Sequence, residues 1–309
     1  MELRLSHSQV NVARKCLYEY KLHYVKGVRR ATRPTYFAFG IAVHEGIRSW
    51  YQGLPLVVDG KHLVDRIYEQ EIDHSRVDAM TLQKLNVEKA KVRGIVEGYI
   101  GHYSDDLTKY DRILTERDAK IPLDVDQSLF KNTKFTYATF FGYLDCLIQD
   151  KSGDWWIKET KTTGDNIDDF IAAAAWSDQL CGYMVLAKSI LGVWPRGVLF
   201  DVIVKSSIQQ RTSRKPESLS QFQRRCYNLY KKEGAEKNLF VRREILFNPR
   251  HIKVWKREIL LAAEDILDSL ARKRFPMNTA SCKGKFGMCD KFSICSTGKI
   301  RSAWFDIKK

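Results

Sequence analysis

The chain has 309 residues, of which 44% are hydrophobic and 12% aromatic, so it has enough apolar side chain to bury a globular core. Its 52 Lys and Arg residues outnumber its 37 Asp and Glu residues, and the formal net charge of +15 at pH 7 indicates a polyanionic partner such as nucleic acid. The N-terminus lacks an apolar signal region, and the longest near-apolar run, residues 170–176, is far shorter than the roughly 20 residues of a membrane span, so we expect a cytoplasmic protein that is neither secreted nor inserted in a membrane.

Hydrophobic periodicity divides the chain into a helical region, a region of strands and a second helical region. Apolar and aromatic residues at helical spacing predict helices over 8–26, 38–52 and 84–103. Alternation from residue 112 onward predicts strands over 112–123, 135–149 and 154–162, with a hairpin turn at 150–153. Beyond them we expect a helix at 168–191, a strand at 196–205, a polar loop, and helices at 217–235 and 249–273. These elements predict an α/β fold with a mixed central sheet flanked by helices.

The most specific motif combines Asp145, in GYLDCLI, with Glu159 and Lys161, in WWIKETKTT. Glu159 and Lys161 are two residues apart on one strand, so their side chains project to the same face. If the hairpin turn holds the three residues 151–153, Asp145 lies directly opposite Glu159, with their Cβ atoms about 5 Å apart. A slip of one residue would turn Asp145 to the other face of the sheet.

Two carboxylates at this distance repel each other unless a proton or a cation lies between them, and a site of oxygen ligands suits Mg²⁺ or Mn²⁺. Such a metal would activate a water and neutralise the charge that develops on a phosphodiester. Lys161 would orient or help to deprotonate that water and would stabilise the transition state. The alternative is that Glu159 and Lys161 are ordinary solvated charges on a strand edge.

Together with its neighbours, this motif makes the sequence resemble the PD-(D/E)XK nuclease superfamily, in particular the RecB-like branch of phage, recombination and CRISPR-associated exonucleases. The resemblance covers most of the chain and rests on five elements in the expected order: His44 in FGIAVHEGIRSW, Glu116 in RILTERDAKIPL, Asp145, the E-x-K of Glu159 and Lys161, and the Q-x-x-x-Y of Gln179 and Tyr183. Leu144 replaces the Pro of the superfamily name, at a position that holds no ligand. Asp118, two residues after Glu116, is the alternative to Glu116 as the acidic residue of this strand.

Three cysteines near the C-terminus, Cys282, Cys289 and Cys295, have the spacing C-x6-C-x5-C. Thiolates in a set of four favour an iron-sulfur cluster or structural zinc, and the x6 gap is longer than the x2 spacing of common zinc ribbons. The RecB-like resemblance implies that Cys16 is the fourth ligand of a 4Fe-4S cluster joining the two ends of the chain. Zinc, or merely reduced surface thiols, are the alternatives. The remaining cysteines lie in apolar or helical segments and are expected in the core: Cys146, Cys181 and Cys226.

Basic and aromatic residues alternate near the N-terminus, a mixture that can contact phosphates and stack on unpaired bases. We expect DNA contacts from Lys15, Tyr20, Lys21, Arg29 and Arg30. The sequence contains no groove-reading motif, so binding is expected to be largely independent of base sequence. The alternative is that the tyrosines belong to the core and the lysines to a solvated face.

The resemblance implies a restriction-endonuclease-like core at 111–210, between a helical region at 1–110 and C-terminal helices with a cysteine-bearing tail at 211–309, in one integrated domain. It implies that His44, Glu116, Asp145 and Glu159 hold the metal, and that Gln179 and Tyr183 position the DNA strand. The implied function is a metal-dependent DNA exonuclease that acts on single-stranded ends in recombination, repair or phage DNA processing, with a helicase or an annealing protein as partner. The alternatives are a structure-specific endonuclease, a CRISPR adaptation nuclease that works with an integrase, and a non-catalytic DNA-binding iron-sulfur protein.

Overall fold

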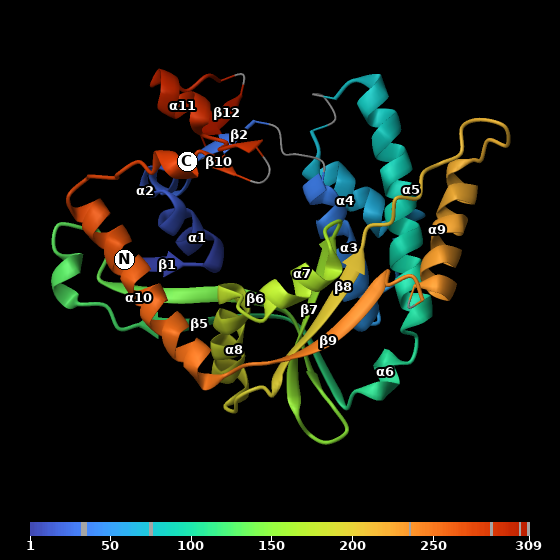
Figure 1. Ribbon diagram of the computed structural model, residues 1–309, viewed down its shortest axis with the longest axis horizontal. Helices are drawn as coiled ribbons and strands as arrows, with labels where there is room; N and C mark the ends of the chain where they lie inside the picture. The colour runs from blue at the N-terminus through green and yellow to red at the C-terminus, as the bar shows by residue number, and fades with distance from the viewer. Residues whose placement is uncertain (32–35, 74–76, 235, 285–286, 303, 308–309) are drawn as a thin grey trace.

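A mixed β-sheet forms the centre of the computed structural model, which describes residues 1–31, 36–73, 77–234, 236–284, 287–302 and 304–307 (Figure 1). The strands are β1 (Glu2–Leu5), β5 (Arg112–Leu123), β6 (Tyr137–Gln149), β7 (Trp155–Thr163), β8 (Gly197–Val204) and β9 (Phe240–Leu246). They follow the order β1-β6-β7-β8-β9, and β5 pairs with β6. β1 is parallel to β6 and β7 to β8, whereas the other pairs are antiparallel. This arrangement confirms the predicted α/β fold with a mixed central sheet.

Helices cover both faces of the sheet (Figure 1). On one face, α1 (His7–Lys15), α8 (Asp178–Leu191) and α10 (Pro249–Ala271) share a core with sheet residues such as Phe140 and Val202. On the other face lie α3 (Tyr36–Tyr51), α4 (Leu63–Glu71) and α5 (Ala79–His102), and α9 (Leu219–Glu233) packs against α5. Gly94 makes this last contact possible, because a Cβ there would lie 2.5 Å from the Gln223 carbonyl oxygen.

Shorter elements complete the described chain: α2 (Leu17–Tyr20), a π-helix at Lys21–Val25, β2 (Val28–Arg30), β3 (Val57–Val58), β4 (Lys61–His62), α6 (Asp106–Lys109), a 3₁₀ helix at Gln127–Phe130, α7 (Ile167–Ala174), a 3₁₀ helix at Thr279–Ser281, β10 (Lys283–Gly284), β11 (Gly287–Met288), α11 (Phe292–Thr297) and β12 (Phe305–Ile307). β12 pairs antiparallel with β2, so the two ends of the chain lie side by side (Figure 1). Leu22, Val28, Ile294 and Phe305 form a small core between them. In the described ranges no single helix is long and apolar enough to cross a membrane; α7 and α8 meet that criterion only as a pair bent by 48°.

The face of strand β6 that is buried against the core changes between Leu144 and Leu147. Leu144 and Leu147 are buried in the same core, although a regular strand turns residues three apart to opposite faces. Glu116, which lies opposite Asp145 in this register, has a positive φ of 43°, a strained conformation for a residue other than glycine. β5 runs along one whole edge of β6, so β1 and β7 share the other edge, where they pair with residues 137–140 and 146–149. Asp145 therefore lies at a fork where β7 separates from β6.

Two predicted helices are divided in the structure. The helix expected at 8–26 is interrupted at Cys16, whose extended backbone (φ −164°, ψ 112°) ends α1 before α2 begins. The helix expected at 168–191 is divided into α7 and α8, because Ser177 caps α8 by accepting a hydrogen bond from the Leu180 amide. β1 and β9 were not predicted from the sequence; each is a short strand at an end of the sheet path.

Candidate active site

The β6–β7 hairpin brings the two carboxylates of the predicted motif to the fork. Cys146 pairs with Lys158, which is the register expected from a three-residue turn, so Asp145 and Glu159 occupy the next opposed positions. Beyond this pair the strands separate, and an Asp145 Oδ2 atom accepts a hydrogen bond from the Thr160 amide at 3.3 Å. Lys161 Nζ lies 2.5 Å from Glu159 Oε1. The predicted register is confirmed, and it places three charged groups in one small volume.

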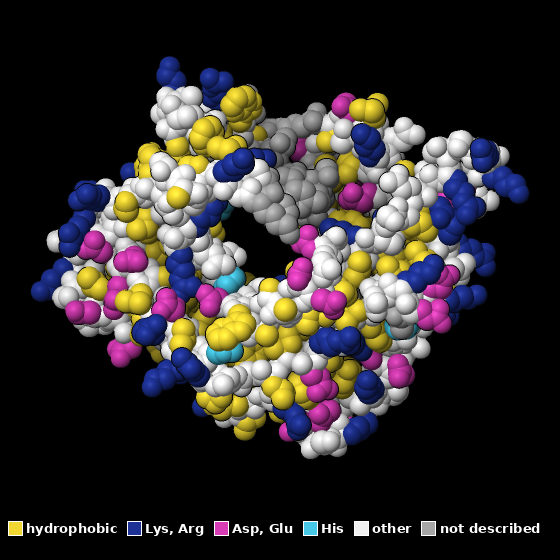
Figure 2. Space-filling view, viewed as in Figure 1, with side chains coloured by type: hydrophobic (Ala, Val, Ile, Leu, Met, Phe, Trp, Pro, Cys, Tyr) yellow, Lys and Arg dark blue, Asp and Glu magenta, His cyan; other side chains and the backbone are white. Residues whose placement is uncertain are grey.

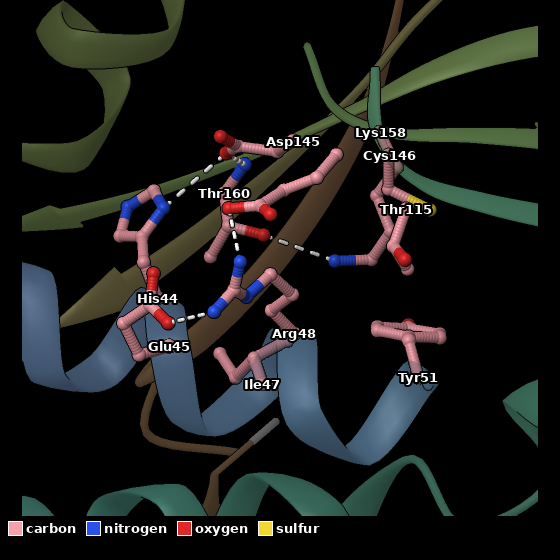
Figure 3. Close-up of a pocket in the computed structure, with 11 residues that line it drawn as sticks. His44, Glu45, Ile47, Arg48, Tyr51, Thr115, Asp145, Cys146, Lys158 and Thr160 are labelled. Carbon is pink, nitrogen blue, oxygen red and sulfur yellow. Dashed lines mark hydrogen bonds and ion pairs between the residues drawn. The ribbon is translucent and has the colours of Figure 1, made fainter. Parts of the chain in front are cut away.

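Helix α3 adds a histidine to this group. His44 points from α3 toward the fork, and its Nδ1 lies 3.3 Å from Asp145 Oδ2 (Figure 3). Burial raises the pKa of Asp145, but the hydrogen bond and charge of His44, together with Lys161, outweigh burial and hold the pKa below its ordinary value. Asp145 is therefore an anion at neutral pH. Sequence reasoning placed His44 at this site by motif, and the structure brings the two side chains together.

Glu159 has a carboxylate oxygen that lacks a hydrogen-bond partner among the described residues. Its side chain is 1% exposed, and its Oε2 is buried without a hydrogen-bond partner among the described residues. Burial and the negative charge of Asp145 raise the pKa of Glu159 to about 7, against the smaller opposing effect of Lys161. Burial lowers the pKa of Lys161, but Glu159 more than offsets this and the pKa is raised. One ammonium thus faces two carboxylates, and a divalent cation fits the remaining negative charge.

Glu116 lies at the rim of this site. Its half-exposed carboxylate pairs with Arg48, which also pairs with Glu45 on the same helix. These side chains line a cavity of about 60 Å³ on the α3 side of the fork, together with His44, Asp145, Lys158 and Thr160 (Figure 3). Asp118, the competing residue, is exposed and is not among the residues that line the cavity. Position therefore favours Glu116 over Asp118 as an additional ligand.

Gln179 and Tyr183 meet as the helical spacing predicts. Both lie on α8, and the Gln179 side-chain amide donates a hydrogen bond of 2.8 Å to the Tyr183 hydroxyl. Burial and the charges of Glu159 and Asp145 raise the pKa of Tyr183, which shows that its hydroxyl lies near the two carboxylates. The pair faces the site from the side of the sheet opposite α3.

A buried ion-pair network lies beneath the site and was not predicted from the sequence. Lys158 Nζ lies 2.6 Å from Asp201 Oδ2 and donates a 3.0 Å hydrogen bond to Thr160 Oγ1. The backbone amide of Thr160 donates to Asp145 Oδ2. Arg242 on β9 lies 3.2 Å from Asp201 and 2.6 Å from Asp106. Burial raises the pKa of Asp201, but the two cations outweigh it and hold the pKa at about 2. The network balances two cations against two anions inside the protein.

Four cysteines from opposite ends of the chain line one cavity. Cys16, Cys282, Cys289 and Cys295 border a space of about 180 Å³, several times the volume that one water needs. The backbone amide of Asn278 donates to Cys16 Sγ at 3.4 Å, and the backbone amide of Cys289 donates to the Cys282 carbonyl oxygen at 2.7 Å. Burial and the proximity of the three other thiols raise the pKa of Cys295. All seven cysteines are free, and the three expected in the core are buried: Cys146, Cys181 and Cys226.

No group of three or more His, Cys, Asp and Glu side chains is already arranged to hold a metal ion within the part of the chain that the structure describes. At the fork, the donors that fit a divalent cation are a carboxylate pair and one imidazole. At the chain ends, four thiols share a cavity and have no disulfide partner.

Four of the residues expected to contact DNA make contacts within the protein, and the fifth, Tyr20, is buried. Lys15 pairs with Glu19 at 3.0 Å and Arg30 with Asp290 at 2.6 Å. Lys21 lies over the rings of Tyr18 and Phe275, and Arg29 over that of Tyr24. Tyr20 is 3% exposed and packs in the main core, so the expectation that it stacks on a base is wrong. Its helical spacing had fitted the core equally well.

Comparisons with known proteins agree with this geometry at the level of a superfamily. The family model described as PD-(D/E)XK nuclease superfamily matches residues 4–296. The chain is also similar to a solved structure described as "Crystal structure of SSO0001", with 15% identity over 71% of this chain and 83% of that one; the TM-score of 0.24 is too low to define the fold. No curated protein matches the chain.

Proposed function

Because the chain belongs to the PD-(D/E)XK nuclease superfamily, we propose that it is a Mg²⁺- or Mn²⁺-dependent DNA exonuclease that acts on single-stranded ends. The observation that carries the proposal is the buried, unpartnered Oε2 of Glu159 beside Asp145 and Lys161. When bound by Asp145, Glu159 and His44, a divalent cation would offset the repulsion between the carboxylates, neutralise the phosphate and activate a water.

The chain's own residues have separable tasks in this proposal. In the metal-free protein, His44 holds the Asp145 carboxylate in place and in its ionised form. Lys161, which stays protonated beside Glu159, stabilises the charge that develops on the phosphodiester in the transition state. Gln179 and Tyr183 offer an amide and a hydroxyl at the edge of the site, where they position the strand. Glu116 contributes a carboxylate from the rim.

The proposal of a single-stranded end is supported by the shape of the molecule. Figure 2 shows a deep central hollow, which lies between α1 on one side and α3 with the end of β8 on the other in the view of Figure 1. An unpaired strand is flexible enough to enter a confined space, and the net charge of +15 favours its phosphates. An enzyme of this kind would serve recombination, repair or phage DNA processing, with a helicase or annealing protein supplying the unpaired end.

We further propose that Cys16, Cys282, Cys289 and Cys295 hold a 4Fe-4S cluster. The support is the cavity that they share and the free state of all four thiols. A cluster there would join the segment around β2 to the segment before β12 and would restrict the unfolded chain. It would also suit a reducing compartment such as the cytoplasm, where cysteines remain reduced.

The test is cleavage of 5′- and 3′-labelled single-stranded DNA, linear and circular, by protein purified without oxygen and supplied with Mn²⁺. We expect the wild type to digest linear DNA, Glu159→Ala to be inactive, and Asp118→Ala, the exposed acid on the neighbouring strand, to keep its activity. Cleavage of circles would indicate an endonuclease, and co-purification with an integrase would indicate CRISPR adaptation. Binding of DNA without cleavage under any divalent metal would overturn the catalytic proposal in favour of a DNA-binding protein.

A further inference from the structure

Trp176 is the most exposed large hydrophobic side chain in the part of the chain that the structure describes, at 72% of its surface. It lies in the bend between α7 and α8, after the exposed alanines at 172 and 173. An indole carries much apolar surface, so its exposure costs free energy that a core position would recover. The small neighbours leave the ring protruding beside the helix.

The ring is held in place although it is exposed. The centroid of the His251 ring, on α10, lies 3.7 Å from that of Trp176 with 40° between the planes. Ser177, the next residue, caps α8 and fixes the backbone at the bend. One side of the indole is therefore supported by an imidazole, and the exposed remainder is presented in a defined orientation.

This supported indole lies close to the catalytic residues. α8 begins two residues after Trp176, and its first turn contains Gln179, which binds Tyr183 beside the two carboxylates. Asp178, in the same turn, pairs with Arg14 of α1 at 2.5 Å, so its negative charge is neutralised. Figure 2 shows hydrophobic side chains and histidine gathered below the central hollow, over the region where α7 meets α8 in Figure 1.

We propose that Trp176, supported by His251, is a stacking platform for one unpaired nucleobase of the strand that enters the site. Every base has a π-face that stacks on an indole, so the platform binds single strands irrespective of sequence. It holds a nucleotide next to the one whose phosphate lies at the fork, and it selects unpaired over paired DNA, because a paired base keeps its faces inside the helix. This inference rests on the proposed function.

The test compares Trp176→Ala with Trp194→Ala by fluorescence anisotropy of a labelled oligothymidine, with Ca²⁺ in place of the catalytic metal. Trp194 is a matched control, because it is 43% exposed, lies beyond the other end of α8 and has its own partner in Lys188. We expect Trp176→Ala to bind about 5- to 150-fold more weakly, the loss of one base stack, and Trp194→Ala to bind as the wild type does. Trp176→Phe should keep most of the affinity.

A second arm uses the same oligonucleotide with one abasic position moved along the strand. In the wild type one position should weaken binding by the same factor as the Trp176→Ala substitution, and in Trp176→Ala that position should have no further effect. If the wild type cleaves DNA and Trp176→Ala binds the oligonucleotide as tightly as the wild type does, the stacking platform is overturned and the proposed function stands. A wild type that neither binds nor cleaves single strands overturns the platform and the proposed function together.

Discussion

Replacing Glu159 with Gln should stabilise the metal-free protein at alkaline pH while removing its activity. Burial and the charge of Asp145 raise the pKa of Glu159 from an ordinary value near 4.5 to about 7. Between these values the native protein keeps a proton that the unfolded chain has released. The unfolded state then binds fewer protons than the native state, so the free energy of unfolding falls as the pH rises.

The size of this effect follows from the two pKa values. Their difference is worth about 3 kcal/mol when fully developed, at about 1.4 kcal/mol per pKa unit. Between about pH 5 and pH 8 the linkage relation yields about 2–3 kcal/mol of that total. Glu159 is 1% exposed, so solvent screening does not reduce the figure substantially. The amide of the Glu159→Gln variant would resemble the protonated carboxyl and would not titrate.

The assay is urea unfolding of Glu159→Gln and of the wild type in EDTA at both pH values. The free energy of unfolding should fall by about 2–3 kcal/mol more in the wild type than in the variant between acid and alkaline pH. Asp145, whose pKa is lowered, contributes in both proteins and largely cancels in the comparison. Parallel pH profiles for the two proteins would refute the reasoning, because they would mean that Glu159 ionises in the native state as easily as in the unfolded chain.

Further perturbations should distinguish the roles of the carboxylate site at the fork, the four-cysteine cavity and the buried ion-pair network. Mn²⁺ at about 100 times its dissociation constant should stabilise the wild type by about 2.7 kcal/mol in thermal or urea unfolding, and Glu159→Gln much less. Lys161→Met should lower kcat by about 10²- to 10³-fold in the labelled-strand assay, with DNA binding retained. Cys16→Ser should lose the brown visible absorption of an iron-sulfur cluster and lower the midpoint of thermal unfolding, whereas the buried control Cys226→Ala should keep the absorption. Asp201→Ala should lower the free energy of unfolding by about 3–5 kcal/mol, because it leaves two buried cations without their shared partner.

The register of the β6–β7 hairpin could be predicted from the sequence because its determinants are local. The turn at 150–153 sets which residues oppose one another, and alternation sets which face each side chain takes. The spacing of Gln179 and Tyr183 is likewise a property of a single helix. Sequence reasoning therefore placed these residues on the strands and on the helix where the structure has them.

Contacts between distant segments could not be predicted in this way. Lys158 stands in an alternating strand like any exposed lysine, and only the position of Asp201 on another strand shows that its ammonium is buried. The change of face at Glu116 and Asp145 depends on a strained backbone that local patterns do not encode. Tyr20 shows the opposite error, since a helical aromatic beside lysines fits a core position and a DNA surface equally well.

Two groups of buried charge lie on either side of Thr160, and they differ in balance. In the network, Lys158 and Arg242 match Asp201 and Asp106, and a balanced set in a low dielectric resists rearrangement because breaking one pair leaves an uncompensated ion. At the fork, Asp145 and Glu159 face one ammonium. Burial and the charge of Asp145 therefore raise the pKa of Glu159. Thr160 connects the two, since its hydroxyl accepts from Lys158 and its amide donates to Asp145. The balanced group thus holds the strand rigid, and the unbalanced group keeps the charge that a divalent cation would neutralise.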